Sequence, residues 1–219
     1  MNRETRAFNF EVRADQNDEH GHFLTGTPIV FDQVTDMGWY AEVIDRGALD
    51  KTDLRDVRFL VGHDTSMIPM ARSRNNNANS TMQLMVLDNR MDIRVDLDTE
   101  NNMEARALYS ASGRGDISGM SFMFTVNGDS WDNVDSDYPT RHIRSIGRVF
   151  EVSAVAFPAY EGTTLEARTE GSPLDSARAS LESARAKLAE ERAAAQLAER
   201  RAKAIERLTK HRKEAVSDE

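Results

Sequence analysis

The aromatic and glycine residues stop well before the end of the chain, and this limits what each part can fold into. The nine Phe, four Tyr and two Trp all lie at or before Tyr160, and all twelve Gly lie at or before Gly171. Beyond Pro173 the chain consists mainly of Ala, Arg, Glu, Lys and Leu, without Gly, Pro or aromatic residues. The front can bury an apolar core, whereas the tail is suited almost only to helix. We therefore predict two domains, residues 1–168 and 169–219.

The predicted tail helix begins at Ser172 and Pro173, which suit an N-cap and a first helical position. Leu174, Leu181 and Leu188 recur every seven residues, but Ala occupies most of the other heptad positions that would form the apolar stripe of the helix. Such a helix would be roughly 60 Å long. Its interleaved charges are typical of a solvated helix or of a docking or scaffold-like element, and it is too rich in Ala for a strong coiled coil alone.

Short strands dominate the front of the chain. Residues 82–97 have the pattern of a hairpin, because apolar and polar residues alternate on both sides of a polar turn. Residues 5–13 alternate in the same way, with Arg6 as the exception. A polar loop is predicted over 127–139. Further strands are predicted at residues 22–31, 39–44, 57–61, 119–126, 141–146 and 149–157.

One helix is predicted between these strands. Thr99 or Asn101 can act as its N-cap, and the helix would stop near Gly113. About seven or eight short strands with one or two helices are typical of an α+β, β-rich fold. We predict a mostly antiparallel β-barrel or sandwich with a few surrounding helices, followed by the long C-terminal helix.

Charge and composition exclude several kinds of site. The net charge is −9, but residues 172–219 hold eleven basic and nine acidic side chains, so the residues before them have a net charge of −11. This acidity argues against nucleic-acid binding. The absence of Cys excludes disulfides and thiolate metal sites, and neither His20 nor His22 belongs to a metal-binding motif. No segment is long and apolar enough to span a membrane, so we expect a cytosolic protein without a metal or cofactor.

Three polar residues, His63, Ser121 and Glu151, stand within or at the end of apolar strand segments. A buried hydroxyl or carboxylate is costly unless it has a hydrogen-bonding partner. Each residue has an ordinary explanation by itself: a histidine at a strand end, a structural serine, and a carboxylate that points to solvent or pairs with a nearby arginine.

Together, a hydroxyl, an imidazole and a carboxylate are the parts of a nucleophilic triad. In such a triad Ser121 would supply the attacking oxygen, His63 would remove its proton, and Glu151 would fix the tautomer and stabilise the imidazolium. An imidazole pKa of about 6.5 suits this role near neutral pH. The order of His, Ser and acid differs from that of the α/β-hydrolases.

Four motifs occur in order along the chain: VGHD at 61–64, PMAR at 69–72, GMSFMF at 119–124, and EVSAV at 151–155 with PAY at 158–160. As a set, between about Phe31 and Arg168, they resemble the prohead maturation protease family of tailed bacteriophages. Those proteins are serine endopeptidases that cut scaffold segments from capsid subunits inside the immature shell. The resemblance implies a fold similar to the herpesvirus capsid assembly protease, a β-barrel surrounded by helices.

By position, His63 matches the family's catalytic histidine, Ser121 its nucleophile and Glu151 its acidic third member. His142 is the main rival of Glu151, because the herpesvirus relatives use a second histidine in the third role. Asp64 is a weaker rival for that role.

Two further points concern the serine and its surroundings. Ser118 is a weaker rival of Ser121, and Met123 stands where the family more often has Gly. Candidates for the oxyanion hole are backbone amides near Ser121 or an arginine from residues 141–148.

The resemblance implies that the substrates are the phage major capsid protein, scaffold segments and the chain itself, within the prohead in the host cytoplasm. It also implies self-association as a dimer or higher oligomer. From the acidity and the lack of a membrane-spanning segment we expect no nucleic-acid or membrane partner. The alternative is a non-enzymatic scaffold or chaperone of capsid assembly. A distance above about 5 Å from Ser121 Oγ to both His63 ring nitrogens would favour that alternative, since proton transfer needs about 2.6–3.2 Å.

Overall fold

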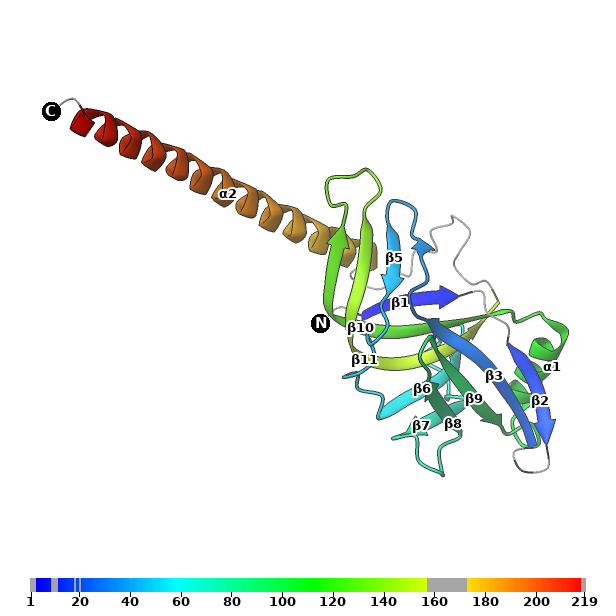
Figure 1. Ribbon diagram of the computed structural model, residues 1–219. Coiled ribbons are helices and arrows are strands. Elements are labelled where there is room, and N and C mark those ends of the chain that lie inside the picture. The colour runs from blue at the N-terminus through cyan, green and yellow to red at the C-terminus, as the bar shows by residue number, and fades with distance from the viewer. Residues whose placement is uncertain (1–2, 9–11, 18, 20, 157–172, 218–219) are drawn as a thin grey trace. The chain divides into compact units, whose positions relative to one another are not determined.

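The computed structural model describes residues 3–8, 12–17, 19, 21–156 and 173–217 (Figure 1). Contacts divide the chain into two compact units, residues 1–177 and 178–219. The predicted domain boundary at residues 168 and 169 lies outside the described residues.

The first unit contains a large and a small β-sheet. In the large sheet, β11 (Thr140–Val155) pairs with β10 (Gly119–Asp132) along one edge. Along its other edge β11 pairs with β5 (Ala41–Ile44) and then with β6 (Asp56–Val61). Seven of the nine pairings between described strands are antiparallel, and the two exceptions are β11 with β5 and β11 with β6. The large sheet comprises β1 (Arg3–Phe8), β10 (Gly119–Asp132), β11 (Thr140–Val155), β5 (Ala41–Ile44), β4 (Thr35–Asp36), β6 (Asp56–Val61) and β7 (Ala71–Arg74). The small sheet comprises β2 (Arg13–Asn17), β3 (Gly21–Val30), β9 (Arg90–Leu97) and β8 (Met82–Val86).

One apolar core includes residues of both sheets. The strand β9 contributes every second residue from Met91 to Leu97, as the alternation predicted. From the large sheet, Phe122 and Phe124 of β10 stack with their ring centroids 4.6 Å apart. Because successive side chains of a strand point to opposite faces, Ser121 faces away from this core.

Both predicted helices are present. The helix α1 (Met103–Arg114) lies beside β2 and β3 (Figure 1). Its N-cap is Asn102, whose side chain accepts from two backbone N–H groups, and not Thr99 or Asn101 as predicted. The helix α2 (Pro173–Ser217) is continuous over 45 residues. Its predicted N-cap, Ser172, lies outside the described residues.

Long-range pairing overrides the local pattern in three places. Residues 127–132, predicted as a loop, continue β10 because they pair with the start of β11. The two strands predicted at 141–146 and 149–157 form one strand, β11, which has several register shifts. Residues 5–13 do not form one strand, since β1 and β2 belong to different sheets, although residues 9–11 lie outside the described part.

The prediction of a β-rich, mostly antiparallel fold with a long C-terminal helix is confirmed. The ladders between the described strands leave two separate sheets, and none of these ladders closes a barrel. The closed barrel and the likeness to the herpesvirus fold therefore stay predictions.

Candidate active site

A tight turn at the end of β6 places His63. Gly62 and His63 both have a φ of 60°, and the backbone N–H of Asp64 donates to the Val61 carbonyl at 3.2 Å. A two-residue turn with positive φ at both central positions has this pattern. Gly adopts that conformation freely, and His is enriched among the few other residues that do. The turn brings the His63 ring back to the neighbouring strand β11.

A β-bulge determines which way Glu151 points. Near the end of its pairing with β10, β11 contains one extra residue, Phe150, which the register skips. As a result, Val149 and Val152 both belong to the core, while Glu151 points to the opposite face of the large sheet. Strict alternation would place Val149 and Glu151 on the same face, so the bulge is what separates the acid from the core.

His63, Glu151 and Ser153 form a closed set of hydrogen bonds. His63 Nδ1 lies 2.7 Å from Glu151 Oε1. The Ser153 hydroxyl donates to Glu151 Oε2 and accepts from the backbone N–H of His63 at 3.1 Å. The side chain of Glu151 is 3% exposed and that of His63 is 27% exposed. We assign the ring proton to Nδ1, because a carboxylate can only accept, and this leaves Nε2 as an acceptor.

Ser121 lies on the same face of the large sheet as these groups. It stands directly opposite Ser153 and diagonally to Glu151 in the register of β10 and β11. Such positions have Cβ atoms about 4.5–5.5 Å and about 7–8 Å apart, respectively. The Ser121 side chain is fully buried, and its hydroxyl donates to the Arg6 carbonyl of β1 at 2.7 Å. Among the described residues, no hydrogen bond joins Ser121 to the His63 ring.

The rival residues lie elsewhere or have other partners. His142 Nδ1 is 2.8 Å from Asp45 Oδ1, near the opposite end of β11 from Glu151. The carboxylate of Asp64 accepts from Ser66 rather than from a histidine. Ser118 is exposed and precedes β10. Within the described chain, Glu151 is therefore the predicted third member that contacts the His63 ring.

Two of the three arginines considered for the oxyanion hole are closely bound to carboxylates. Arg144 pairs with Asp45. Arg141 donates to Glu4 at 2.9 Å and to Asp129 at 2.7 Å. A charge already neutralised by close carboxylates is a poor oxyanion stabiliser. Arg148 is only 3.9 Å from Asp53, and its Nε has no hydrogen-bond partner among the described residues, so Arg148 and backbone N–H groups remain the candidates.

Four buried charged residues form what we call the β1 charge cluster: Glu4 and Arg6 of β1, Glu42 of β5 and Arg141 of β11. Arg6 Nη2 lies 2.7 Å from both Glu4 Oε2 and Glu42 Oε2. Burial by itself would raise the pKa of Glu4, but the positive charges of Arg6 and Arg141 and the hydrogen bond from Arg141 lower it to about 2. The sequence signal for this cluster was Arg6, the one residue that broke the alternation of its strand.

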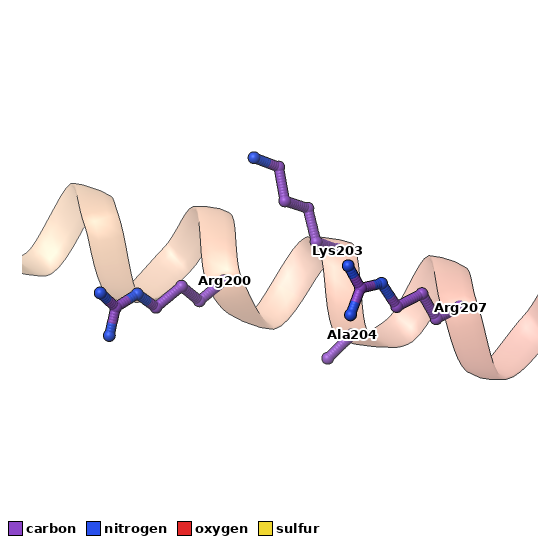
Figure 2. Close-up of a pocket in the computed structure, with 4 residues that line it drawn as sticks. All are labelled: Arg200, Lys203, Ala204 and Arg207. Atoms are coloured by element: carbon purple, nitrogen blue, oxygen red, sulfur yellow. The ribbon is translucent and has the colours of Figure 1, made fainter.

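No metal or membrane feature stands out in the described residues. Within them, no group of three or more His, Cys, Asp or Glu side chains could hold a metal ion. None of the described helices is long and apolar enough to cross a membrane. A shallow pocket on α2 is lined by Arg200, Lys203, Ala204 and Arg207, whose side chains Figure 2 shows, and none of these is a predicted catalytic residue.

Comparison with known proteins decides the family. The family model described as caudovirus prohead serine protease matches residues 8–175, which include the whole His63, Glu151, Ser153 and Ser121 neighbourhood. The chain belongs to this family. No curated protein and no solved structure is significantly similar to it. Membership in the caudovirus prohead serine proteases makes the chain a bacteriophage serine peptidase of capsid maturation.

Ser153 is the residue of this candidate site that the sequence interpretation missed. It was noted only as part of the EVSAV motif. Because residues two apart on a strand share a face, its spacing from Glu151 was the signal that could have found it. The PAY motif at 158–160 lies outside the described residues.

Proposed function

We propose that the chain is a self-processing serine endopeptidase in which Ser121 is the nucleophile, His63 the general base and Glu151 the residue that orients the base. The observation that supports this most is the 2.7 Å contact of His63 Nδ1 with Glu151 Oε1, on the face of the sheet that Ser121 shares. The acid occupies one ring nitrogen and leaves the other to receive a proton.

In the acylation step, the Ser121 hydroxyl turns from the Arg6 carbonyl toward His63 Nε2. The proton passes to Nε2 while Oγ attacks the carbonyl carbon of the scissile peptide bond. Glu151 stabilises the imidazolium that forms, and it remains ionised. When the tetrahedral intermediate collapses, Nε2–H protonates the leaving amine, and the acyl group stays on Ser121.

In the deacylation step, a water molecule takes the position of the departed amine. His63 Nε2 accepts a proton from this water as its oxygen attacks the acyl carbon. The same nitrogen then returns the proton to Ser121 Oγ, and a carboxylic acid leaves.

The substrates in this proposal are the phage major capsid protein and its scaffold segments, cleaved within the prohead. The helix α2, with its interleaved charges, would hold the protease in the shell during assembly and would be released by self-cleavage. Self-association into a dimer or higher oligomer is part of the same proposal.

Co-expression with the capsid subunit tests the proposal. We expect Ser121→Ala to abolish cleavage of the capsid protein and of the chain itself while the fold remains intact. Mass spectrometry of both proteins would report the cleavage, and circular dichroism the fold. Cleavage that continues unchanged in this variant would remove Ser121 from the role of nucleophile.

One observation favours the alternative, a non-enzymatic assembly scaffold. The Ser121 hydroxyl is buried and bound to a backbone carbonyl, as a structural serine would be. If this is its only role, a fluorophosphonate reporter will not label Ser121 in the full chain. Labelling at Ser121 would exclude the scaffold as the sole function.

A further inference from the structure

We infer that Ser153 is a positioning residue of the protease site, which holds both the catalytic base and its carboxylate partner through one hydroxyl. This inference rests on the proposed function. The Ser153 hydroxyl is bound to Glu151 and to the backbone of His63, so in this inference it acts through these two residues and not through contact with a substrate.

The position of Ser153 in the sheet makes this role possible. On β11 it pairs with Ser121 of β10 on one side and with Leu60 of β6 on the other. It therefore lies between the strand of the nucleophile and the strand that leads into His63. Glu151, Val152 and Ala154 also pair with both strands, but Ser153 is the one that stands directly opposite Ser121.

The hydroxyl of Ser153 uses both of its hydrogen-bonding functions. Its proton goes to Glu151 Oε2, and its oxygen accepts from the backbone N–H of His63 at 3.1 Å. A glutamate carboxyl rotates easily about its last torsion, so one hydrogen bond from the ring would leave Glu151 free to turn. The second bond from Ser153 removes that freedom and keeps Oε1 aimed at Nδ1.

The same hydroxyl acts on the backbone of His63. This residue has the left-handed conformation, which is unfavourable for a side chain with a Cβ and persists only where its surroundings hold it. By binding the His63 N–H, Ser153 anchors the turn at the point where the ring leaves the backbone. The orientation of the His63 ring then depends on Ser153 in two ways, through the Glu151 carboxylate at Nδ1 and through the backbone N–H.

The test is the rate at which a fluorophosphonate reporter labels the full-length chain, with the labelled serine located by peptide mass spectrometry. We expect Ser153→Ala to lower the maximal labelling rate of Ser121 by about 10- to 100-fold, the size expected for the loss of a hydrogen bond to a charged group. The reporter concentration that gives half this rate should not change. In nuclear magnetic resonance spectra, the Nδ1 proton of His63 should exchange faster with water.

Two further variants separate hydrogen bonding from packing. Ser153→Cys fills the space of the hydroxyl with a slightly larger thiol that makes only weak hydrogen bonds, so we expect it to be as slow as Ser153→Ala. It also carries the test if the alanine variant does not fold. Ser73→Ala is the matched control, because Ser73 is equally buried on β7 and its hydroxyl has no partner among the described residues. Its labelling rate should equal that of the unaltered chain.

The outcomes distinguish this inference from the proposed function. A full labelling rate in Ser153→Ala, or a slow alanine variant beside a fast cysteine variant, would overturn the positioning role while Ser121 remains the nucleophile. Reporter found on Ser153 itself would overturn both. Unchanged labelling of Ser121→Ala would overturn the proposed function, and the inference with it.

Discussion

At the scale of single residues, the Ser121 hydroxyl donates to the Arg6 carbonyl, whereas the proposed mechanism requires it to donate to His63 Nε2. A neutral hydrogen bond contributes about 0.5–1.5 kcal/mol net, and about 1.4 kcal/mol is a factor of ten in an equilibrium. Turning the hydroxyl away from Arg6 therefore lowers the reactive population by about tenfold at most. The observed bond slows the proposed reaction without preventing it.

The third member of the triad is decided by comparing two single substitutions. We expect Glu151→Gln to lower the labelling or cleavage rate by about 10²- to 10⁴-fold, because the neutral amide no longer stabilises the imidazolium or fixes its tautomer. His142→Gln should leave the rate unchanged, since His142 binds Asp45 near the other end of β11. An inactive His142→Gln beside an active Glu151→Gln would transfer the third role to the histidine.

At the scale of elements, the turn after β6 and the bulge in β11 orient the site. Each departs from regular strand geometry at one place, and each does so next to a proposed catalytic side chain. A regular β11 would place Glu151 toward the apolar core, where an ionised carboxylate is costly. The irregularities are therefore as much a part of the site as the side chains themselves.

The turn makes a prediction about stability. A Cβ added at Gly62 would meet no atom within 4 Å, but the residue has a φ of +60°. Gly62→Ala should therefore destabilise the fold by about 1–2 kcal/mol through backbone strain alone. Urea unfolding followed by circular dichroism would measure this change.

A second glycine is the control. Gly113 lies in α1, and an added Cβ would be in ordinary contact with Ala14 at 3.7 Å. Gly113→Ala should stabilise the fold by up to about 1 kcal/mol. If Gly62→Ala were equally stabilising, the left-handed turn at His63 would be absent in solution.

The elements also show how far sequence patterns could predict this molecule. The hairpin of β8 and β9 was predictable because the alternation is uninterrupted in β9 and holds from Met82 to Leu84 in β8. The extent of β10 and β11 was not predictable from the sequence. Bulges break the alternation, and the polar residues at the end of β10 and the start of β11 are in strands only because they pair with each other. The three proposed catalytic residues were chosen by chemistry and resemblance. The hydrogen bonds that join His63 and Glu151 to Ser153 depend on the register of β11 against β10 and β6, which no local sequence pattern specifies.

At the scale of the whole first unit, the β1 charge cluster joins the first strand to strands from the middle and the end of the unit. Its residues come from β1, β5 and β11, and Ser176 Oγ adds a hydrogen bond to Glu4 Oε1 at 2.7 Å. Removing one partner of such a cluster would leave an unpaired buried charge, which is strongly destabilising.

The cluster predicts a loss of stability in acid. The pKa of Glu4 is lowered from 4.5 to about 2 in the folded chain, so its contribution is complete above about pH 4.5 and is lost as the pH falls toward 2. The loss should be on the order of 3 kcal/mol, since one pKa unit corresponds to about 1.4 kcal/mol. Urea unfolding at several pH values between 6 and 2 would measure it.

Glu4→Gln serves as the comparison for this acid prediction. The variant should be less stable than the unaltered chain at neutral pH and should lose less stability on acidification, because it no longer has this carboxyl to protonate. An identical acid profile in both proteins would assign the acid sensitivity to other carboxyls.

The pairing of β1 with β10 also sets an order of events during synthesis. Arg6 and Ser121 are 115 residues apart, and Glu151 follows Ser121 on the next strand of the hairpin. Pairings between such distant segments require the closure of long loops, and they form late compared with local hairpins. A ribosome must therefore have released nearly the whole first unit before the serine, histidine and acid can meet. The proposed site can therefore form only after β11 has been made and has paired with both β10 and β6.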